Sequence, residues 1–406
     1  VHSPLLGHIR SGVVTGLETD YIGAAVGHAL SEGIMEKPVI FRTHGGRPAD
    51  IESGRSHIDV AFIAAPTADE AGNCTGIIGK SACGSLGYAF ADAMCADKTV
   101  VITDNLFSYP LARRSISEVY VDYVVQVGSI GDPGRIASGT TKLPRDPIAL
   151  RIADMAAKAI DASGLLVDGV SFQTGAGGAS LATAASLHRI MSKRGVKGSY
   201  ALGGITGYIV DMMREGCFES IQDVQCFDQK AVESLRDDPN HIEITASDYA
   251  SPDAKSSAAS HLDVVVLGAT QIDTDFNVNV HTDSNGYIMG GSGGHSDVAE
   301  EAKLTVIVAP LSRSRLSIVV DHVDCVSTPG SSVDLLVTQA GIAVNPRRPE
   351  LAERLKAAHL RVVDIRALKE KSEKLNGTAK AAPHGERAVA LVLDRRGNEI
   401  DRIYQV

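Results

Sequence analysis

Four short clusters of glycine in this sequence each stand beside a polar side chain that could take part in chemistry. They are His44-Gly-Gly-Arg47, Gln173-Thr-Gly-Ala-Gly-Gly178, Gly203-Gly-Ile-Thr206 and Gly293-Gly-His-Ser-Asp297. Glycine lets backbone N–H groups come close to a ligand, and an oxyanion that develops during acyl transfer needs such fixed donors. We therefore expect these clusters to surround a ligand through their backbone.

The second cluster also has a competing interpretation as a nucleotide site. Gly175, Gly177 and Gly178 follow a predicted strand and precede a predicted helix, as in dinucleotide-binding folds. However, Ser180 stands at the third glycine position, and the next predicted strand ends in Ala201-Leu-Gly-Gly204 without the acid that would bind a ribose. An N–H cradle for a thioester or a pantetheine-like arm fits these residues better.

The polar side chains beside the glycines have structural alternatives. His295 and Asp297 could reach a pocket, although a single histidine more often makes hydrogen bonds within the fold. Arg47 could hold a carboxylate, and the sequence does not choose between it and Arg313, Arg315, Arg347 or Arg348.

Two stretches resemble each other and indicate two related domains. The stretch from His57 to Asp69 aligns without a gap with that from His261 to Asp273. Each opens with an apolar run typical of a buried parallel strand and continues into an Asp-x-x-x-Asn segment, 69–73 and 273–277. These aspartates and asparagines are expected to stabilise turns, and ligand binding is the alternative role.

The chain as a whole predicts an α/β protein. Strands, glycine loops and helices alternate, which favours mostly parallel sheets with helices on their faces and ligands at the carboxyl ends of the strands. Since 406 residues exceed one ordinary core, we expect an N-terminal domain over 1–145 and a C-terminal domain over 146–406, with 128–147 as the linker. The segments 388–393 and 400–406 predict a terminal β-hairpin.

Composition excludes some classes of protein. The formal charge of −10 argues against nucleic-acid binding, and no apolar run reaches the roughly 20 residues of a membrane span. Six cysteines without a CxxC pair indicate reduced thiols and no metal site. Val1 is not an initiator Met and begins no signal peptide, so we expect elements to be missing at the start of the first domain.

Longer motifs carry a family resemblance. The paired segments 59–73 and 262–277, followed by Gly293-Gly-His-Ser-Asp297, resemble the two halves of the coenzyme A transferase superfamily. More closely, the chain resembles the alpha subunits of citrate lyase, through the motifs FQTGAGGASLA (172–182), ALGGIT (201–206), PNHIEI (239–244), IDTDFNVNV (272–280), TPGSSVD (328–334) and GIAVNPRRPELAERL (341–355).

The resemblance implies a coenzyme A transferase-type enzyme. Citrate would replace acetate on the thioester of an acyl carrier protein, giving a citryl thioester that a separate beta subunit cleaves. The superfamily's nucleophilic glutamate has no counterpart in Gly203-Gly-Ile-Thr206, so we expect direct attack by citrate without a covalent acyl-enzyme intermediate. A citramalate-type or other acyl transferase or hydrolase is the alternative activity, and a nicotinamide dehydrogenase and a non-catalytic assembly subunit are weaker alternatives.

The resemblance also implies partners. They are citrate, the beta subunit and the gamma carrier subunit, which bears an arm derived from dephospho-coenzyme A. No cofactor is expected on this chain itself, while acetyl-coenzyme A or coenzyme A could also bind. We expect a cytoplasmic hetero-oligomer, or a homo-oligomer when the chain is alone, bound to neither membrane nor nucleic acid.

These considerations give a set of candidate residues. We assign the chemistry to Gln173, Thr206 and His295. We assign binding of substrate and thioester to Gly45, Gly46, Arg47, Thr174, Gly175, Gly177, Gly178, Gly203, Gly204, Asn277, Gly293, Gly294 and Asp297, and we expect no metal ligands.

Overall fold

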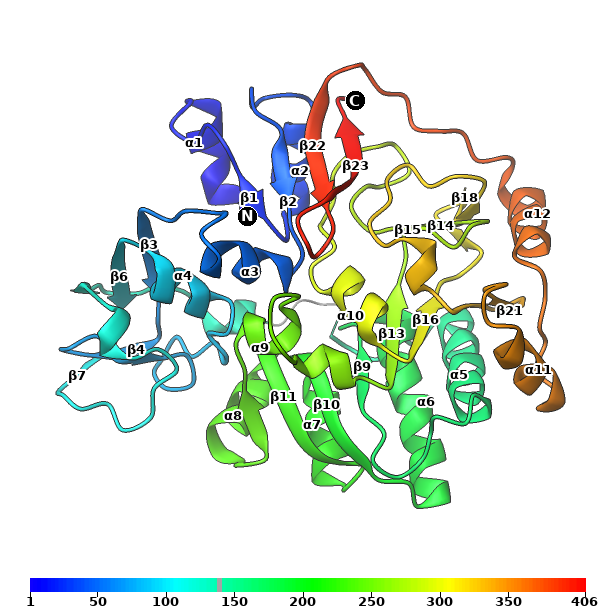
Figure 1. Ribbon diagram of the computed structural model, residues 1–406, viewed down its shortest axis with the longest axis horizontal. Helices are drawn as coiled ribbons and strands as arrows, with labels where there is room; N and C mark the ends of the chain where they lie inside the picture. The colour runs from blue at the N-terminus through cyan, green and yellow to red at the C-terminus, as the bar shows by residue number, and fades with distance from the viewer. Residues whose placement is uncertain (137–140) are drawn as a thin grey trace.

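The computed structural model describes residues 1–136 and 141–406 and is organised around one large, mostly parallel sheet (Figure 1). Its strands lie in the order β12-β11-β10-β9-β13-β16-β20-β21, and only β20 and β21 are antiparallel neighbours. Their bounds are β9 Phe172–Thr174, β10 Gly198–Ile205, β11 Phe218–Cys226, β12 His241–Glu243, β13 Val264–Gly268, β16 Leu304–Val308, β20 Leu335–Thr338 and β21 Gly341–Val344.

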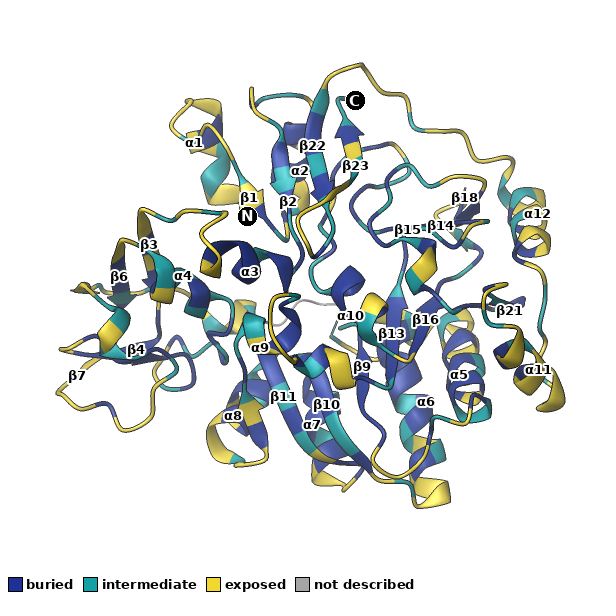
Figure 2. Cartoon of the chain, viewed as in Figure 1, coloured by how far each residue is buried: buried dark blue, intermediate teal, exposed yellow. Residues whose placement is uncertain are grey.

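Helices cover both faces of this sheet, which explains why β13 and β16 are almost wholly apolar. One face packs against α5 (Pro147–Ala162), α6 (Gly178–Arg194), α7 (Gly207–Arg214), α8 (Gln229–Asp237) and α11 (Pro349–Ala357). The other packs against α9 (Ala246–Ala250), α10 (His295–Glu301) and α12 (Ile365–Asn376). In Figure 2 the strands inside these layers are largely dark blue, the colour of buried residues, with less buried positions on β10 and β11.

Local sequence fixes the ends of the two helices that matter most below. Asp146 caps α5 by accepting from the Ala149 N–H, and Pro147 occupies the first turn. The residues of α5 that face the sheet, among them Ile152, Ala156 and Ile160, are fully buried. Helix α6 ends at Gly195, which adopts a left-handed φ of 69°.

The chain order places a ligand crevice at β9 and β13. From β9 the chain moves outward through β10, β11 and β12, and it then returns to the other side of β9 to build β13, β16 and β20. Such a switch in direction opens a crevice beyond the carboxyl ends of the two central strands. The loop 175–177 follows β9 at this point.

A smaller lobe repeats the part of the large sheet that β13, β16 and β20 form. It contains a parallel sheet of β3 (Val60–Ala64), β6 (Lys98–Thr103) and β8 (Tyr123–Gln126), helix α4 (Ala89–Cys95), and a second sheet of β4 (Thr67–Asp69), β5 (Cys74–Thr75) and β7 (Leu106–Phe107). The matching elements are β13-β16-β20, α10, and the sheet of β14 (Gln271–Asp273), β15 (Val278–Asn279) and β19 (Val319–Val320). A small hairpin of β17 (Ser312–Arg313) and β18 (Leu316–Ser317) follows β16.

The two Asp-x-x-x-Asn segments confirm this repeat. Asp69 accepts from the backbone and side chain of Asn73, at 3.0 and 2.7 Å. Asp273 accepts from the backbone and side chain of Asn277, at 2.9 and 3.0 Å. Each asparagine also accepts a backbone N–H from a later segment, so both pairs are turn devices in matching places.

The remaining sheet joins the two ends of the chain. Strands β1 (Glu18–Thr19) and β2 (Val39–Phe41) run parallel to each other and to β22 (Ala388–Leu393), which forms the predicted terminal hairpin with β23 (Glu399–Tyr404). The hairpin therefore extends a sheet of N-terminal residues. Helices α1 (Leu6–Arg10), α2 (Ala24–Ser31) and α3 (Gly46–Glu52) accompany this sheet. Part of the predicted linker, 137–140, lies outside the described residues.

Candidate functional site

A cavity of about 820 Å³ lies where the N-terminal sheet meets the large sheet. Its lining includes Asp20, His44, Arg47, Tyr88, Asp92, Ala176, Phe227 and Gly293. Asp20 directly follows β1, His44 follows β2, Ala176 follows β9 and Phe227 follows β11. The cavity therefore sits at the carboxyl ends of parallel strands, as the sequence predicted for a ligand.

His44 is held in this cavity by a carboxylate. Its Nδ1 lies 2.7 Å from Oδ2 of Asp20, and because a carboxylate only accepts, Nδ1 carries the proton and Nε2 lies beside Gly293. Burial alone would raise the pKa of Asp20, but the charge and hydrogen bond of His44, together with Arg47, hold it below its ordinary value. Tyr88 packs against the imidazole at 4.5 Å between ring centroids. The pair is thus an oriented imidazole within reach of a ligand.

Arg47, a predicted binding residue, also lines the cavity and forms a fork with Asp92. Its two terminal nitrogens donate to the two carboxylate oxygens at 2.9 and 2.5 Å. Burial would lower the pKa of Arg47, whereas Asp92 and Asp20 raise it, so the guanidinium stays charged. Of the five arginines that the sequence offered, Arg47 is the one in this cavity lining.

Asp297, the second charged binding candidate, is buried behind the cavity wall. It accepts from Thr43 Oγ1 at 2.7 Å and from the Gly45 N–H at 3.0 Å, and the Arg395 guanidinium lies 3.9 Å away. Burial raises the pKa of Asp297 to about 6, although these neighbours favour its charged form. Asp297 therefore fixes the 43–47 loop that carries His44 and Arg47.

The paired glycines are places of close approach between loops. A Cβ atom on Gly45 would lie 2.0 Å from the Ala250 carbonyl oxygen, and one on Gly46 would lie 2.9 Å from that of Arg395. A Cβ on Gly294 would lie 2.4 Å from the Tyr249 hydroxyl. Gly293 has a left-handed φ of 53°, and its Cβ would meet His44 Nε2 at 2.9 Å. These glycines bring the segments around His44 together.

Two of the catalytic candidates leave buried polar atoms unsatisfied. Gln173 donates from Nε2 to the Tyr249 hydroxyl at 2.9 Å and packs over Gly203. Within the described ranges, neither Gln173 Oε1 nor Thr206 Oγ1 has a hydrogen-bond partner. Buried polar atoms are rarely left so, and a bound ligand or water commonly satisfies them. Gly204 packs against the ring of Phe227, a residue of the cavity lining.

The glycine loop after β9 presents backbone donors beside the cavity. The Gly175 N–H bonds to Val266 on β13, and Gly177 caps α6 without a side-chain hydrogen bond. Gly178, with a φ of 58°, begins the helix, and Ala176 lines the cavity. The N–H groups of the first turn of α6 are thus suited to hold an anion. Thr174 Oγ1 donates back to the Gly175 carbonyl at 3.3 Å.

His295, the third catalytic candidate, makes hydrogen bonds within the fold through both ring nitrogens. Nε2 donates to the Gly268 carbonyl at 2.9 Å, and Nδ1 pairs with Thr328 Oγ1 at 2.8 Å. Burial lowers the pKa of His295 to about 4. The neutral imidazole, hydrogen-bonded at both ring nitrogens, joins α10 to β13. This is the structural role that the sequence left open as the alternative to a role in a pocket. Asn277, a predicted binding residue, likewise makes its hydrogen bonds within the fold, to Asp273 and to the Gly330 N–H.

Sequence reasoning missed the cavity residues Asp20, Tyr88 and Asp92, as well as Tyr249 beneath it. Asp20 could have been found as an acid directly after a strand. Tyr88 and Asp92 begin α4, and no motif marked them.

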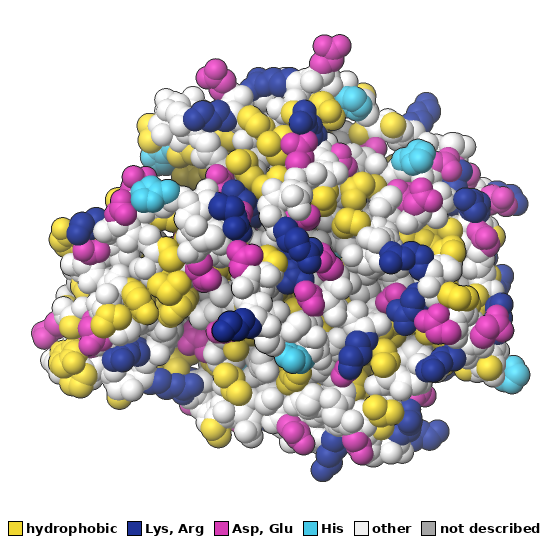
Figure 3. All heavy atoms as spheres, in the orientation of Figure 1, with side chains coloured by type: hydrophobic (Ala, Val, Ile, Leu, Met, Phe, Trp, Pro, Cys, Tyr) yellow, Lys and Arg dark blue, Asp and Glu magenta, His cyan; other side chains and the backbone are white. Residues whose placement is uncertain are grey.

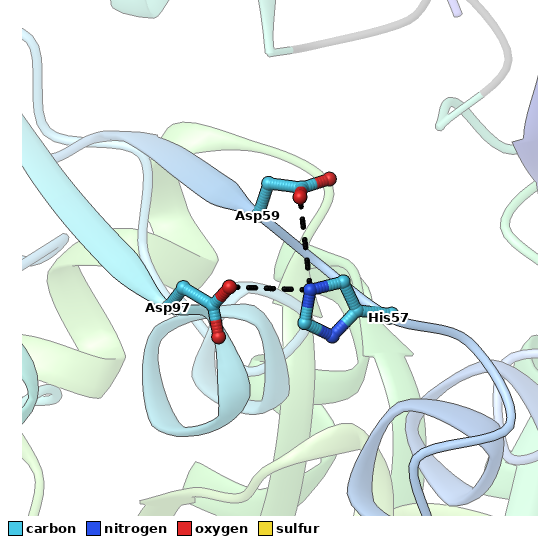
Figure 4. Close-up of side chains that lie close together, drawn as sticks. All are labelled: His57, Asp59 and Asp97. Carbon is cyan, nitrogen blue, oxygen red and sulfur yellow. Dashed lines mark ion pairs between the residues drawn. The ribbon is translucent and has the colours of Figure 1, made fainter.

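One cluster of possible metal ligands occurs in the part of the chain that the structure describes (Figure 4). His57 Nε2 lies 3.7 Å from Asp59 and 3.2 Å from Asp97, and the three side chains are 62%, 89% and 64% exposed. Ion pairs this exposed to solvent are common on protein surfaces and contribute little to stability. No helix in the described ranges is long and apolar enough to cross a membrane.

Comparison with known proteins adds the family context. A family model described as citrate lyase, alpha subunit, matches residues 1–406. The citrate lyase alpha chain of Escherichia coli is 46% identical over 405 residues, which are 100% of this chain and 79% of that protein. The alpha subunit of citrate lyase from Streptococcus mutans, solved in complex with citrate, superposes with a TM-score of 0.97 at 47% identity, over 99% of this chain and 79% of that one.

A more distant structure shows how general the fold is. The 4-hydroxybutyrate CoA-transferase of Porphyromonas gingivalis has a TM-score of 0.51 at 17% identity, over 90% of this chain and 96% of that one. The predicted coenzyme A transferase-like architecture is thereby confirmed.

Proposed function

Because this chain belongs to the family of citrate lyase alpha subunits, an enzyme subunit of the coenzyme A transferase type, we propose that its cavity exchanges acetate for citrate on a carrier thioester. One observation carries the proposal. The cavity at the strand ends presents His44 and Arg47 in a chain whose 47%-identical relative was solved with citrate.

Citrate can be held by groups already in place. Arg47 supplies a fixed positive charge, the Nε2 atom of His44 supplies a hydrogen bond, and the first turn of α6 supplies N–H donors. Gln173 and Thr206 add polar atoms that lack partners among the described residues. A volume of about 820 Å³ is ample for citrate and leaves room for the end of a thioester arm.

The exchange needs two acyl transfers. A citrate carboxylate oxygen attacks the acetyl carbonyl, the carbon–sulfur bond breaks, and the carrier leaves as a thiolate from a mixed citryl–acetyl anhydride. The thiolate then attacks the citryl carbonyl of this anhydride, forms citryl thioester and releases acetate. The segment from Gly203 to Thr206 carries no carboxylate, which supports direct attack over a covalent enzyme intermediate. This chain contributes alignment and oxyanion stabilisation.

The chain is one subunit of the citrate lyase complex, and we propose its partners on the same basis. The gamma carrier subunit would bring the dephospho-coenzyme A-derived arm to the cavity, and the beta subunit would cleave the citryl thioester. Acetyl-coenzyme A or coenzyme A would enter by the same route as the arm. All six cysteines are free thiols, which supports a reducing cytoplasmic location.

The test is mass spectrometry of acetylated carrier protein after mixing with this protein and citrate. We expect the carrier to change from acetyl to citryl, and we expect Arg47→Ala to slow the change while Arg313→Ala, an exposed arginine outside the cavity, leaves it unaffected. If the carrier stays acetylated with the unsubstituted protein in its complex, the proposed exchange is wrong.

A further inference from the structure

The turn of the terminal hairpin is fixed by its own hydrogen bonds. It joins β22 to β23 through Asp394-Arg395-Arg396-Gly397-Asn398. Oδ1 of Asp394 accepts from the backbone N–H groups of Arg396 and Asn398, both at 2.8 Å, and Gly397 adopts a left-handed φ of 83°. The directions in which the two arginines leave the turn are therefore set locally.

The two arginines of this turn end in opposite environments. Arg395 is 2% exposed, and an arginine is almost never buried so completely unless it is paired. The side chain of Arg396 is 56% exposed and pairs with Glu300 on α10 at 2.6 Å. Figure 1 shows this turn, in red, between α3 and α10, and Figure 3 shows basic and acidic side chains next to each other on the surface there. One turn thus offers a buried arginine and an exposed control.

The buried guanidinium of Arg395 joins two helices. Its Nη2 donates to the carbonyl of Ala250, the last residue of α9, at 2.8 Å, and its Nη1 pairs with Glu301, the last residue of α10. Its Nε lies 3.9 Å from Oδ1 of Asp297 and has no hydrogen-bond partner among the described residues. The positive charge of Arg395 therefore lies beside a buried carboxylate.

This arrangement encloses the 43–47 loop. The two oxygens of Asp297 accept from two successive parts of the loop, a threonine hydroxyl and the Gly45 N–H. The Ala250 carbonyl, which anchors the guanidinium, would lie 2.0 Å from a Cβ on Gly45, and the carbonyl of Arg395 itself would lie 2.9 Å from a Cβ on the next glycine. The histidine and the arginine of the loop face the cavity on its other side.

The charge of Arg395 matters because Asp297 is buried. Among the groups that interact electrostatically with this carboxylate are Arg395, His44, Tyr88 and Tyr249, and of these four Arg395 alone is permanently charged. Burial raises the pKa of Asp297 to about 6, and Arg395 and His44 oppose that rise. Without Arg395 the protonated acid becomes more favourable. One oxygen of that acid carries a hydrogen, so its grip on the loop weakens.

We propose that Arg395 is a positioning residue for citrate: acting through Asp297, it holds the 43–47 loop in the conformation that presents His44 and Arg47 to the cavity. The inference rests on the proposed function, which assigns citrate binding to these two side chains. Arg395 lies behind the cavity wall and does not touch the ligand space. The terminal hairpin, which joins the fold by pairing with β2, therefore also supports the site.

The experiment measures kcat and the citrate KM in the carrier assay, with the subunit in its complex. We expect Arg395→Met, which removes the charge and the donors, to raise the citrate KM about tenfold, because a displaced loop misplaces the groups that bind citrate. Arg395→Lys keeps the charge and should raise the KM about threefold or less. Arg396→Met is the matched control and should change neither constant. Loss of folded protein would lower the apparent kcat and leave the KM unchanged, so the KM separates positioning from stability.

A double-mutant cycle tests the route through Asp297. Asp297→Asn alone should also raise the citrate KM, and adding Arg395→Met to it should raise the KM no further, because both substitutions break the same connection. The double variant lacks the buried carboxylate that Arg395→Met leaves uncompensated. Its comparison with Asp297→Asn therefore decides the point even if Arg395→Met alone does not fold.

Three results would overturn the proposal. The citrate KM of folded Arg395→Met could stay within about twofold of that of the unsubstituted protein, well below the tenfold rise that a displaced site implies. Arg396→Met could raise the KM as much as Arg395→Met does. Arg395→Met could raise the KM as strongly in the Asp297→Asn background as without it. The unsubstituted protein tests the proposed function separately: if it transfers no citrate, both claims are wrong, whereas normal transfer with any of these three results refutes the positioning role alone.

Discussion

Replacing the buried Asp297 with Asn should change how stability depends on pH. Asp297 is 0% exposed and accepts from Thr43 and the Gly45 N–H. Burial raises its pKa from 3.8 to about 6. A rise of this size corresponds to about 3 kcal/mol of differential stability between its two protonation states.

The sign follows from proton binding in the two states. Below pH ~4 both the folded and the unfolded chain carry the proton on Asp297, and this part of the stability is fully present. Between pH ~4 and ~6 the unfolded chain releases the proton while the folded chain keeps it, so stability falls as pH rises. Above the folded pKa the loss is complete. The Asn side chain of the Asp297→Asn variant does not titrate, so the variant lacks this pH-dependent loss of stability.

The assay is urea unfolding of the unsubstituted protein and of Asp297→Asn from pH 4 to pH 7. Taking the difference between the two proteins at each pH cancels every other titrating group. We expect the unsubstituted protein to lose about 3 kcal/mol relative to the variant over this range. Asp59→Asn, at a side chain 89% exposed, should show no such change. Parallel profiles for the unsubstituted protein and Asp297→Asn would refute the reasoning.

Three further substitutions test the cavity itself. Gly293→Ala should cost about 1–2 kcal/mol in urea unfolding, because its φ is 53°, and should lower transfer activity by displacing His44; normal activity would contradict the role of that contact. Arg47→Lys should raise the citrate KM about tenfold in the carrier assay, since lysine cannot form the fork with Asp92, and an unchanged KM would exclude Arg47 from citrate binding. Asp20→Asn should lower kcat about tenfold or more, with unchanged melting temperature, because it removes the carboxylate that orients His44; a change in stability alone would indicate a structural pair.

The sequence predicted the fold more fully than the site. Apolar runs, glycine loops and the repeated Asp-x-x-x-Asn segments depend on local chemistry, and the structure confirms the parallel sheets and the terminal hairpin. The pairing of that hairpin with β2 connects residues more than 300 positions apart, and no local pattern encodes it.

The site depends on contacts of the same long-range kind. The glycine clusters lie where loops approach each other closely, because such an approach requires glycine whichever loops meet. Which side chain faces the cavity depends on packing: His295 turns toward Gly268, Asp297 turns toward the 43–47 loop, and His44 faces the ligand space. Asp20 reaches His44 because β1 and β2 pair in parallel, and no local pattern encodes that pairing.

Direct attack by citrate is the central claim, and oxygen labelling tests it most directly. Citrate with ¹⁸O in its carboxylates is mixed with acetylated carrier and excess protein for a single turnover. The isotopic content of the released acetate is then measured by mass spectrometry. If citrate attacks the thioester itself, the anhydride oxygen comes from citrate, and each acetate carries one ¹⁸O atom. If a carboxylate of this chain attacks first, the acetate is unlabelled in the first turnover and the label enters the protein, which would contradict the account.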